Sequence, residues 1–389
     1  MKGLREMILG EPLIARVLDT GAEVFLVGGY VRDLLTGARS KDIDFIVRGD
    51  IRSLLSRVFP EQATVIAFKK ALTVRVVAGD YTMDFSELRG SIEEDLSGRD
   101  FTMNAIAWSP KEGTIDPLRG RDDIVRQRIK AISEGNFVSD PLRLLRAYRF
   151  AGELGWKIEG GTRRLTRKLA GLIKRSAAER ITSELFRLVS SRYCLSALKM
   201  ADKDGLAGEV VAVEREKLSD NIRSLSFLDA FLEKMREESS LRLDEPFSQG
   251  LTYVGLLRAE QLLYGSVAEK NPLRLSRAIL KRVTVTDHLM SMFEKEKRAN
   301  SAEMYDLFAE AGDGAMDFAL LTRRRRFVKE AERFLSMKNL LPAERVMEIT
   351  GSGEGPKLGL LIKEMRKMQF LGELRDENDA IKWLSGQGK

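Results

Sequence analysis

The chain has 389 residues, 43% of them hydrophobic and 32% charged, so it is long enough for two to four globular domains and too apolar for general disorder. A net charge of +7 and a pI near 9.3 favour a polyanionic partner. The one cysteine, Cys194, excludes an internal disulfide and a paired-cysteine metal site, and residues 1–15 lack the apolar run of a signal peptide, so we expect a cytoplasmic protein without a membrane span.

The first 110 residues alternate short strand-like runs with loops. The runs AEVFLVGG, KDIDFIVRG, ATVIAF, LTVRVVAG, YTMDFSE and MNAIAW are rich in β-branched or aromatic residues and are bounded by Gly, Asp or Ser. After Ser139 the pattern changes to helical spacing, as in PLRLLRAYRFAGELG, RITSELFRLVS, LDAFLEKMREE and RFVKEAERFLSMKNL. The sequence therefore predicts an α+β chain, with a sheet domain followed by helices.

Two glycines, Gly28 and Gly29, follow the strand-like run AEVFLV and precede a segment of helical spacing that carries Arg32. Glycines at a strand-to-helix turn let a triphosphate approach backbone amides, and the start of a helix adds partial positive charge. Arg32, about one turn into the helix, would then reach a phosphate oxygen. A glycine pair alone is more often an ordinary turn, so the interpretation depends on the residues that follow.

Two carboxylates, Asp42 and Asp44, flank Ile43 in the next strand-like run. The alternation of a strand places both on one face, with Ile43 and Phe45 on the other. Carboxylates on one face repel each other unless a cation lies between them. Magnesium prefers such oxygen ligands, and two-metal nucleotidyl transfer uses them to activate a 3′-hydroxyl and to brace the triphosphate. The alternative is a polar strand entry that faces water.

A third carboxylate from a neighbouring strand would complete a site of this kind. Asp84, in the run YTMDF, is the candidate. An exposed strand residue without a catalytic role is the competing interpretation.

These motifs resemble the DNA polymerase beta superfamily, and in particular its bacterial-type (class II) tRNA nucleotidyltransferase and poly(A) polymerase family. GGYVRDLL with DIDF resembles the first motif of that family, SGRDFTMNAIAW the second, DPLRGRDDI the third, DPLRLLRAYRFAGELG the fourth and ERITSELFRL the fifth. The resemblance implies a polymerase-beta-like nucleotidyltransferase head over residues 1–138 and helical neck, body and tail segments over 139–204, 205–345 and 346–389. Residues 205–345 contribute almost nothing to the resemblance.

The resemblance also implies roles for individual residues. Magnesium ligation falls to Asp42 and Asp44, with Asp84 as the third catalytic candidate. Asp116 belongs to the third motif without an assigned role. Asp140 and Arg143 match the pair that selects the incoming base. The implied nucleotide-binding residues are Gly28, Gly29, Arg32, Arg99, Asp100, Asn104, Asp140, Arg143, Arg146 and Arg149.

The base-selecting pair is chemically reasonable, because a carboxylate accepts from the exocyclic amine of cytosine or adenine and an arginine donates to a ring nitrogen or carbonyl. A structural role competes with it, since Asp140 precedes Pro141 and is a candidate helix N-cap. On a continuous helix Arg149 would fall roughly opposite Asp140. Arg146 and Arg149 therefore contact either phosphates or other side chains of the fold.

Two positions depart from the pattern of the family. Gly98 stands where the second motif usually has an arginine, and Ser139 where the fourth usually has a glutamate. The segment between Asp84 and Asp95 is also short beside family members that add a terminal adenosine. His288, the single histidine, cannot form the multi-histidine metal site of an appended phosphohydrolase domain, and we expect it on a helix surface.

The sequence thus favours an enzyme that adds CTP-derived nucleotides to the 3′ end of tRNA with Mg²⁺, the CC-adding form ahead of full CCA addition with ATP. An A-adding enzyme and a poly(A) polymerase rank below these. An RNA-binding protein that has lost catalysis is the alternative from another class. A small-molecule nucleotidyltransferase would share the glycine turn and the paired aspartates, but would not explain the segment from Asp140 to Arg149.

Overall fold

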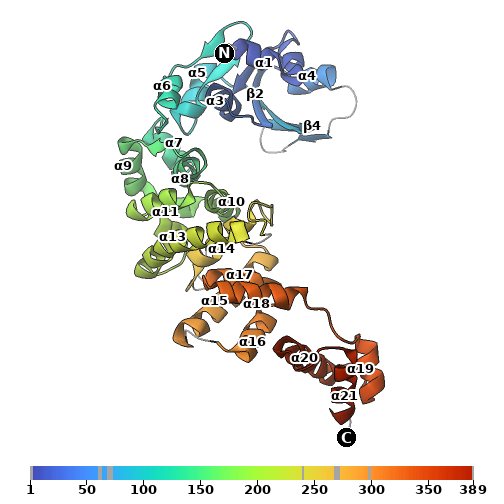
Figure 1. Cartoon of the computed structure of the whole chain (residues 1–389). Coiled ribbons are helices and arrows are strands. Elements are labelled where there is room, and N and C mark those ends of the chain that lie inside the picture. Colours follow the sequence, from blue (N-terminus) through green and yellow to red (C-terminus); the bar gives the residue numbers. More distant parts are fainter. Residues whose placement is uncertain are drawn as a thin grey trace. The chain divides into compact units, whose positions relative to one another are not determined.

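The structure is a computed structural model that describes residues 3–59, 64–67, 73–238, 241–266, 272–296 and 299–387. It consists of two compact units, Met1–Val210 and Val211–Lys389 (Figure 1). The first contains a mixed sheet and helices, and the second is helical. The predicted order of an N-terminal sheet followed by helices is confirmed, while the finer division into four segments stays a prediction.

The strands of the first unit form one large sheet and one small one. Within the described residues the large sheet has the order β3-β4-β5-β2-β1-β6-β7, in which only β2 and β5 pair in parallel. The strands are β1 (Glu23–Val27), β2 (Asp42–Arg48), β3 (Thr64–Ala67), β4 (Thr73–Ala78), β5 (Tyr81–Glu87), β6 (Ala107–Ser109), β7 (Gly113–Ile115), β8 (Arg128–Ile129) and β9 (Lys157–Ile158).

Strands β1 to β6 match the predicted runs with one correction and one gap, whereas β7, β8 and β9 were not predicted. The run MNAIAW is not a continuous strand, because Thr102–Asn104 form a 3-10 turn (η1) and the strand begins only at Ala107. The Asp100 carboxylate accepts from the Phe101 amide and so favours a turn at this point. Parts of the predicted runs ATVIAF and LTVRVVAG lie outside the described residues.

Apolar side chains cover both faces of the central strands. Phe45 of β2 and Phe85 of β5 are register partners, and their rings stack with centroids 5.0 Å apart. A second cluster joins Phe25, Ile46 and Leu96 with neighbours from β1 and α5. Phe45 is buried on one face of β2. Because side chains alternate along a strand, its two neighbours in the sequence project from the other face.

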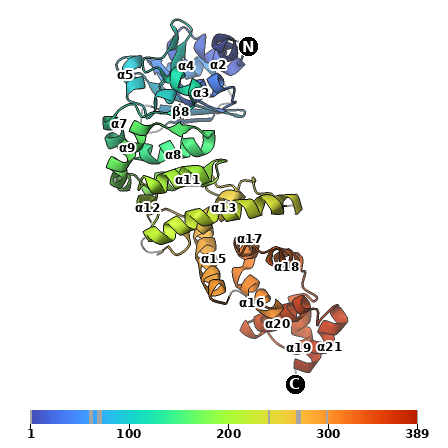
Figure 2. The ribbon, with the colours of Figure 1, turned by 60° about the vertical axis from the view of Figure 1, so that its left-hand side comes forward.

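Helices of the first unit pack against the large sheet, as α3 does against β1 and β2, and further helices follow along the chain. α8 packs against α10 and α11, and Figure 2 shows α8 beside α11. It begins after Pro141 and ends at Gly155, whose φ of +71° closes the helix without a Cβ clash. The helices are α1 (Leu4–Leu9), α2 (Pro12–Leu18), α3 (Gly29–Thr36), α4 (Ile51–Val58), α5 (Ile92–Ser97), α6 (Gly120–Val125), α7 (Glu134–Ser139), α8 (Leu142–Leu154), α9 (Gly160–Leu169), the 3-10 helix η2 (Ala170–Arg175), α10 (Ala178–Val189), α11 (Cys194–Lys203) and α12 (Ala207–Val210).

The second unit is built of helices with aromatic and aliphatic cores. A separate apolar cluster that includes Val346, Met365 and Leu384 holds its last three helices together. His288 lies on α15 with an exposed side chain, as expected, 3.5 Å from a Glu310 oxygen. The elements are α13 (Arg215–Glu238), α14 (Tyr253–Leu263), α15 (Arg277–Glu296), α16 (Ser301–Ala311), the 3-10 turn η4 (Gly312–Gly314), α17 (Ala315–Leu321), α18 (Arg325–Ser336), α19 (Ala343–Thr350), α20 (Pro356–Leu371) and α21 (Glu377–Gln387).

In the part of the chain that the structure describes, no helix has both the length and the hydropathy required to cross a bilayer.

Candidate active site

The glycine turn has the predicted conformation. β1 ends at Val27, Gly28 adopts φ +76° and α3 begins at Gly29. A Cβ on Gly28 would lie 2.8 Å from Nη1 of Arg99 and 3.2 Å from Oδ2 of Asp44. Gly28 is therefore required both for its left-handed backbone and for the close approach of these two side chains.

The paired aspartates lie on one face of β2, as predicted. Asp42 and Asp44 are on the side opposite the buried Ile43 and Phe45. Burial raises the pKa of the Asp44 carboxyl, the neighbouring Asp84 and Asp42 carboxylates add to this effect, and Arg99 opposes it. A divalent cation between Asp42 and Asp44 would relieve this repulsion, so the donor set fits a magnesium ion.

Asp84 is the register partner of Asp44 in the parallel β2–β5 pair, and Arg75 is its partner on β4. Both Asp84 oxygens accept from Arg75, at 2.7 Å each. Among the described residues, no group of three or more His, Cys, Asp or Glu side chains already forms a metal cage. Asp84 thus lies next to the Asp42 and Asp44 pair, but its carboxylate is already paired with Arg75. Its role as a third magnesium ligand stays a prediction.

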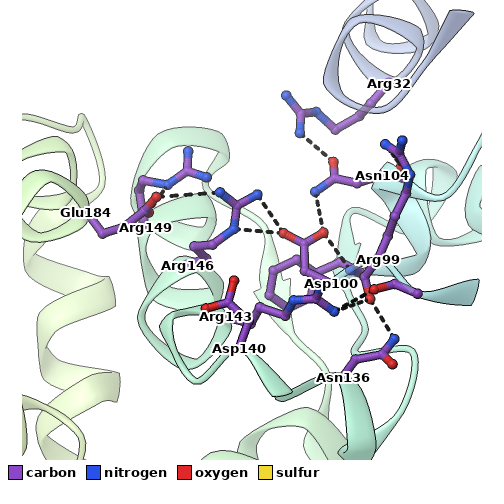
Figure 3. Close-up of polar contacts among 12 residues, drawn as sticks. Arg32, Arg99, Asp100, Asn104, Asn136, Asp140, Arg143, Arg146, Arg149 and Glu184 are labelled. Carbon is purple, nitrogen blue, oxygen red and sulfur yellow. Dashed lines mark hydrogen bonds and ion pairs between the residues drawn. The ribbon is translucent and has the colours of Figure 1, made fainter. Parts of the chain in front are cut away.

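A chain of polar contacts joins α3 to α8 (Figure 3). Arg32 Nη1 donates to Asn104 Oδ1 at 2.7 Å, and Asn104 Nδ2 donates to Asp100 at 3.0 Å. Arg146 then donates to the other Asp100 oxygen from Nε at 2.8 Å. Burial alone would raise the pKa of Asp100, but Arg146 and the hydrogen bonds from Asn104, Arg146 and the Phe101 amide outweigh it, and the pKa is lowered. Asp100 stays ionised and fixes both Asn104 and Arg146.

Arg149 is held more deeply than Arg146. Its side chain is 2% exposed and donates to Glu184 and Glu153, each at 2.5 Å. The guanidinium carbons of Arg32, Arg146 and Arg149 all lie 3.8–5.5 Å from the ring centroid of Phe150. These contacts match the structural alternative for Arg149, although its side chain still lines the same cavity as Asp140. Asp140 precedes α8, so the helical rotation that would separate the two residues does not apply.

Asp140 is not consumed by helix capping. α8 has no side-chain cap, and the Asp140 carboxylate instead accepts two hydrogen bonds from Arg180 on α10, at 3.1 and 3.0 Å. Arg143 uses Nη1 to donate to the carbonyls of Gly98 and Arg99, at 2.8 Å each. Both side chains face one cavity, so the predicted pair is brought together in space.

The candidate site residues line one cavity of about 380 Å³. Its lining includes every nucleotide-binding and magnesium-binding candidate from the sequence, namely Gly28, Gly29, Arg32, Asp42, Asp44, Arg99, Asp100, Asn104, Asp140, Arg143, Arg146 and Arg149. Asp84 and Asp116 are not in the lining, and the Asp116 carboxylate accepts from the Gly120 and Arg121 amides at the start of α6. The cavity has room for a nucleotide and joins carboxylates, arginines and a glycine turn.

Sequence reasoning missed several side chains of the site. The cavity lining adds Asp33, Ser40, Phe150, Glu153 and Arg187. Of these, Phe150 and Glu153 follow Arg146 by four and seven residues on α8, so helical spacing could have placed them on the Arg146 face. Arg187 comes from α10, and no local sequence pattern shows that it reaches the cavity.

Comparisons with known proteins agree with this architecture. The family model described as the poly A polymerase head domain matches residues 24–94 and 83–130. The model described as a probable RNA and SrmB-binding site of polymerase A matches residues 155–211.

Two curated relatives and one solved structure extend the comparison. A CC-adding tRNA nucleotidyltransferase of Synechocystis is 28% identical over 94% of this chain and 93% of its own length. Another, of Halalkalibacterium halodurans, is 36% identical over 48% of this chain and 51% of its length. The structure of the Thermotoga maritima CCA-adding enzyme complexed with tRNA superposes with a TM-score of 0.74 and 20% identity, covering 100% of this chain and 99% of that one. At that identity, the structural likeness supports the fold alone.

Proposed function

Since the chain belongs to the bacterial-type tRNA nucleotidyltransferase and poly(A) polymerase family, we propose that it adds cytidylate from CTP to the 3′ end of tRNA and stops before the terminal adenosine. One observation carries the proposal. A single cavity brings together the Gly28 turn, the Asp42 and Asp44 carboxylates, and the base-selecting candidates Asp140 and Arg143.

In this proposal Asp42 and Asp44 hold Mg²⁺, which supplies Lewis-acid activation of the 3′-hydroxyl and charge neutralisation of the triphosphate. The chain itself positions the phosphates. Gly29 presents its backbone amide at the start of α3, whereas the Gly28 amide donates to the Ile106 carbonyl at 3.2 Å. Arg32 and Arg99 supply positive charge beside this turn. Asp100 keeps its negative charge and orients Asn104 and Arg146 around the nucleotide.

Base choice follows from hydrogen-bond polarity. The Asp140 carboxylate accepts from the exocyclic amine of cytosine, and Arg143 donates to the ring nitrogen or carbonyl beside it. Uracil presents a carbonyl where cytosine has its amine, so it would face the carboxylate with an acceptor. Arg180 keeps the carboxylate in place for this recognition.

The CC-adding form is favoured by a short connection. Only residues 88–91 separate β5 from α5, and Ser91 with Glu94 already forms a capping box at the start of that helix. This connection is too short to rearrange and adapt the cavity to adenine as well as cytosine. The two curated relatives described above are also named CC-adding. Full CCA addition is the runner-up, followed by A-adding and poly(A)-polymerase activities and then an inactive RNA-binding protein.

The test uses purified protein, Mg²⁺ and three tRNA acceptors, which end at the discriminator base, at one added C and at CC. Each is incubated with CTP, ATP, UTP or GTP separately, and products are resolved at single-nucleotide length. We expect two cytidylates on the first acceptor, one on the second and none on the third. ATP incorporation on the CC-ended acceptor would replace the CC-adding proposal by full CCA addition, and no incorporation at all would refute the enzymatic one.

A further inference from the structure

Three consecutive backbone carbonyls, those of Ser97, Gly98 and Arg99, accept hydrogen bonds from side chains outside their own segment. Figure 3 shows the two donors, Asn136 and Arg143, beside Arg99. Asn136 on α7 donates from Nδ2 to the Ser97 and Arg99 oxygens, at 2.7 Å each. Arg143 on α8 donates from Nη1 to the Gly98 and Arg99 oxygens, at 2.8 Å each. We call this arrangement the carbonyl clamp.

The donors and acceptors of the carbonyl clamp are matched in number. A primary amide has two N–H donors, and a carbonyl oxygen accepts two hydrogen bonds. Asn136 uses both donors, and the Arg99 oxygen is filled by Asn136 and Arg143 together. Only the amide nitrogen of Asn136 can face two carbonyl oxygens, so the orientation of its side chain is fixed by the contacts themselves.

The clamped segment carries Arg99, which lies at the phosphate side of the cavity. Its Nη1 approaches the Gly28 turn, and its charge opposes the rise in the Asp44 pKa. Its Nε donates to Asp95 at 3.0 Å. The backbone of Arg99 is therefore held by α7 and α8, while its side chain faces the phosphate and magnesium side.

The other end of the clamp lies beside the base-selecting pair. Asn136 precedes Asp140 by four residues, and Arg143 is itself a member of the pair. Both departures from the family pattern also belong to this region, since Gly98 supplies one clamped carbonyl and the Ser139 hydroxyl donates to the Asn136 carbonyl at 2.9 Å.

We propose that Asn136 is a positioning residue that acts through the Arg99 carbonyl and couples base recognition at Asp140 and Arg143 to triphosphate binding beside Gly28. The proposal rests on the proposed function for the identity of the nucleotide. Asn136 itself touches no reacting atom.

The experiment compares Asn136→Ala and Asn136→Asp with the wild type. Calorimetry measures CTP binding with Mg²⁺, and steady-state assays measure KM and kcat. Loss of two hydrogen bonds predicts CTP binding about 5- to 10-fold weaker for Asn136→Ala. Asn136→Asp keeps the shape but turns a carboxylate toward two carbonyl oxygens, so it weakens CTP binding further. The ratio of CTP to UTP use also falls, because recognition of the base at Asp140 and Arg143 no longer strengthens triphosphate binding.

A double-mutant cycle with Arg99→Ala separates positioning from general loss of structure. If Asn136 acts through Arg99, adding Asn136→Ala to Arg99→Ala weakens CTP binding by no more than about twofold. An equal loss in both backgrounds would overturn the proposal, as would wild-type CTP binding by both Asn136 variants.

Asn221 provides a matched control in the helical unit. Its Nδ2 also donates to two carbonyls, those of Leu262 and Tyr264, at 3.2 and 2.7 Å. Asn221→Ala should lower the melting temperature and leave CTP binding unchanged. If the wild type binds CTP but transfers no nucleotide, only the proposed function is refuted. If the wild type is active and the Asn136 variants bind CTP as tightly as it does, only the positioning role of Asn136 is refuted.

Discussion

The Asp140 carboxylate is held by the Arg180 guanidinium through two hydrogen bonds of 3.1 and 3.0 Å, across 40 residues of sequence. The contact joins the segment before α8 to the start of α10. It fixes the direction of both Asp140 oxygens before any base arrives. Because the pair is partly exposed, its net contribution to stability is small, and its main effect is on orientation.

Arg180→Ala should therefore weaken base recognition more than it weakens the fold. We expect the KM for CTP to rise about two- to fivefold, equivalent to about 0.5–1 kcal/mol, with discrimination against UTP reduced. Arg180→Lys should recover part of the loss by keeping the charge without the two-pronged geometry. Lys168→Ala removes another exposed ion pair of the first unit, with Glu134, and should change neither quantity. Unchanged kinetics for Arg180→Ala would show that Asp140 needs no partner.

Gly37 is a control for the Gly28 turn. Both glycines have positive φ, but Gly28 has ψ −136° whereas Gly37 is in the left-handed helical region with ψ 9°. A Cβ on Gly28 would meet Arg99 and Asp44, whereas a Cβ on Gly37 would have nothing within 4 Å. Gly37→Ala should lower stability by about 1 kcal/mol. Gly28→Ala should lower it by more, because both its ψ and the contacts of its Cβ oppose a side chain. Only Gly28→Ala should also abolish nucleotide addition, because it displaces Arg99 and the Asp44 carboxylate. Equal activity of the two variants in the incorporation assay would remove the turn from the site.

The site could be predicted from the sequence where its geometry is local. The Gly28 turn depends on conformational freedom at one residue, and the shared face of Asp42 and Asp44 depends on the two-residue period of a strand. The partners Arg180 and Asn136 could not be predicted, because their contacts depend on how α7, α8 and α10 pack.

The contacts of Asp84 within the sheet also depend on long-range packing and could not be predicted from the sequence. Its position beside Asp44 follows from the parallel register of β2 and β5, and its engagement by Arg75 from the register of β4. The sequence of one strand does not determine its register with a neighbouring strand, so neither contact could be predicted.

Asp42→Asn tests the paired carboxylates directly. The substitution keeps the shape of the side chain but removes one negative charge, so nucleotide addition should fall by at least about 100-fold, more than the loss typical of residues that only support a metal ligand. tRNA binding, measured by filter retention without nucleotide, should stay within about twofold of the wild type, because a neutral Asn adds no repulsion. Asp80→Asn changes an exposed aspartate before β5 and should leave both quantities intact. Full activity of Asp42→Asn would exclude Asp42 from catalysis.

Glu260 of α14 predicts a pH-dependent stability of the helical unit. It is 3% exposed, one of its oxygens accepts from Thr286 at 3.3 Å, and the other has no hydrogen-bond partner among the described residues. Burial raises the pKa of Glu260 well above its ordinary value, and Asp317 adds to the effect while Arg282 opposes it. The folded protein therefore holds this proton more tightly than the unfolded chain.

The stabilisation from this proton is complete below the unfolded-state pKa and is lost as pH rises through the folded-state pKa. Glu260→Gln keeps the shape and has no proton to lose, so it should raise stability at neutral and alkaline pH by about 1 kcal/mol or more and flatten the pH profile. Urea unfolding between about pH 5 and 9 measures the effect. Glu233→Gln, an exposed change on α13, is the control and should follow the wild type. A Glu260→Gln variant that is less stable than the wild type at alkaline pH would mean that the buried carboxylate is stabilised in its charged form.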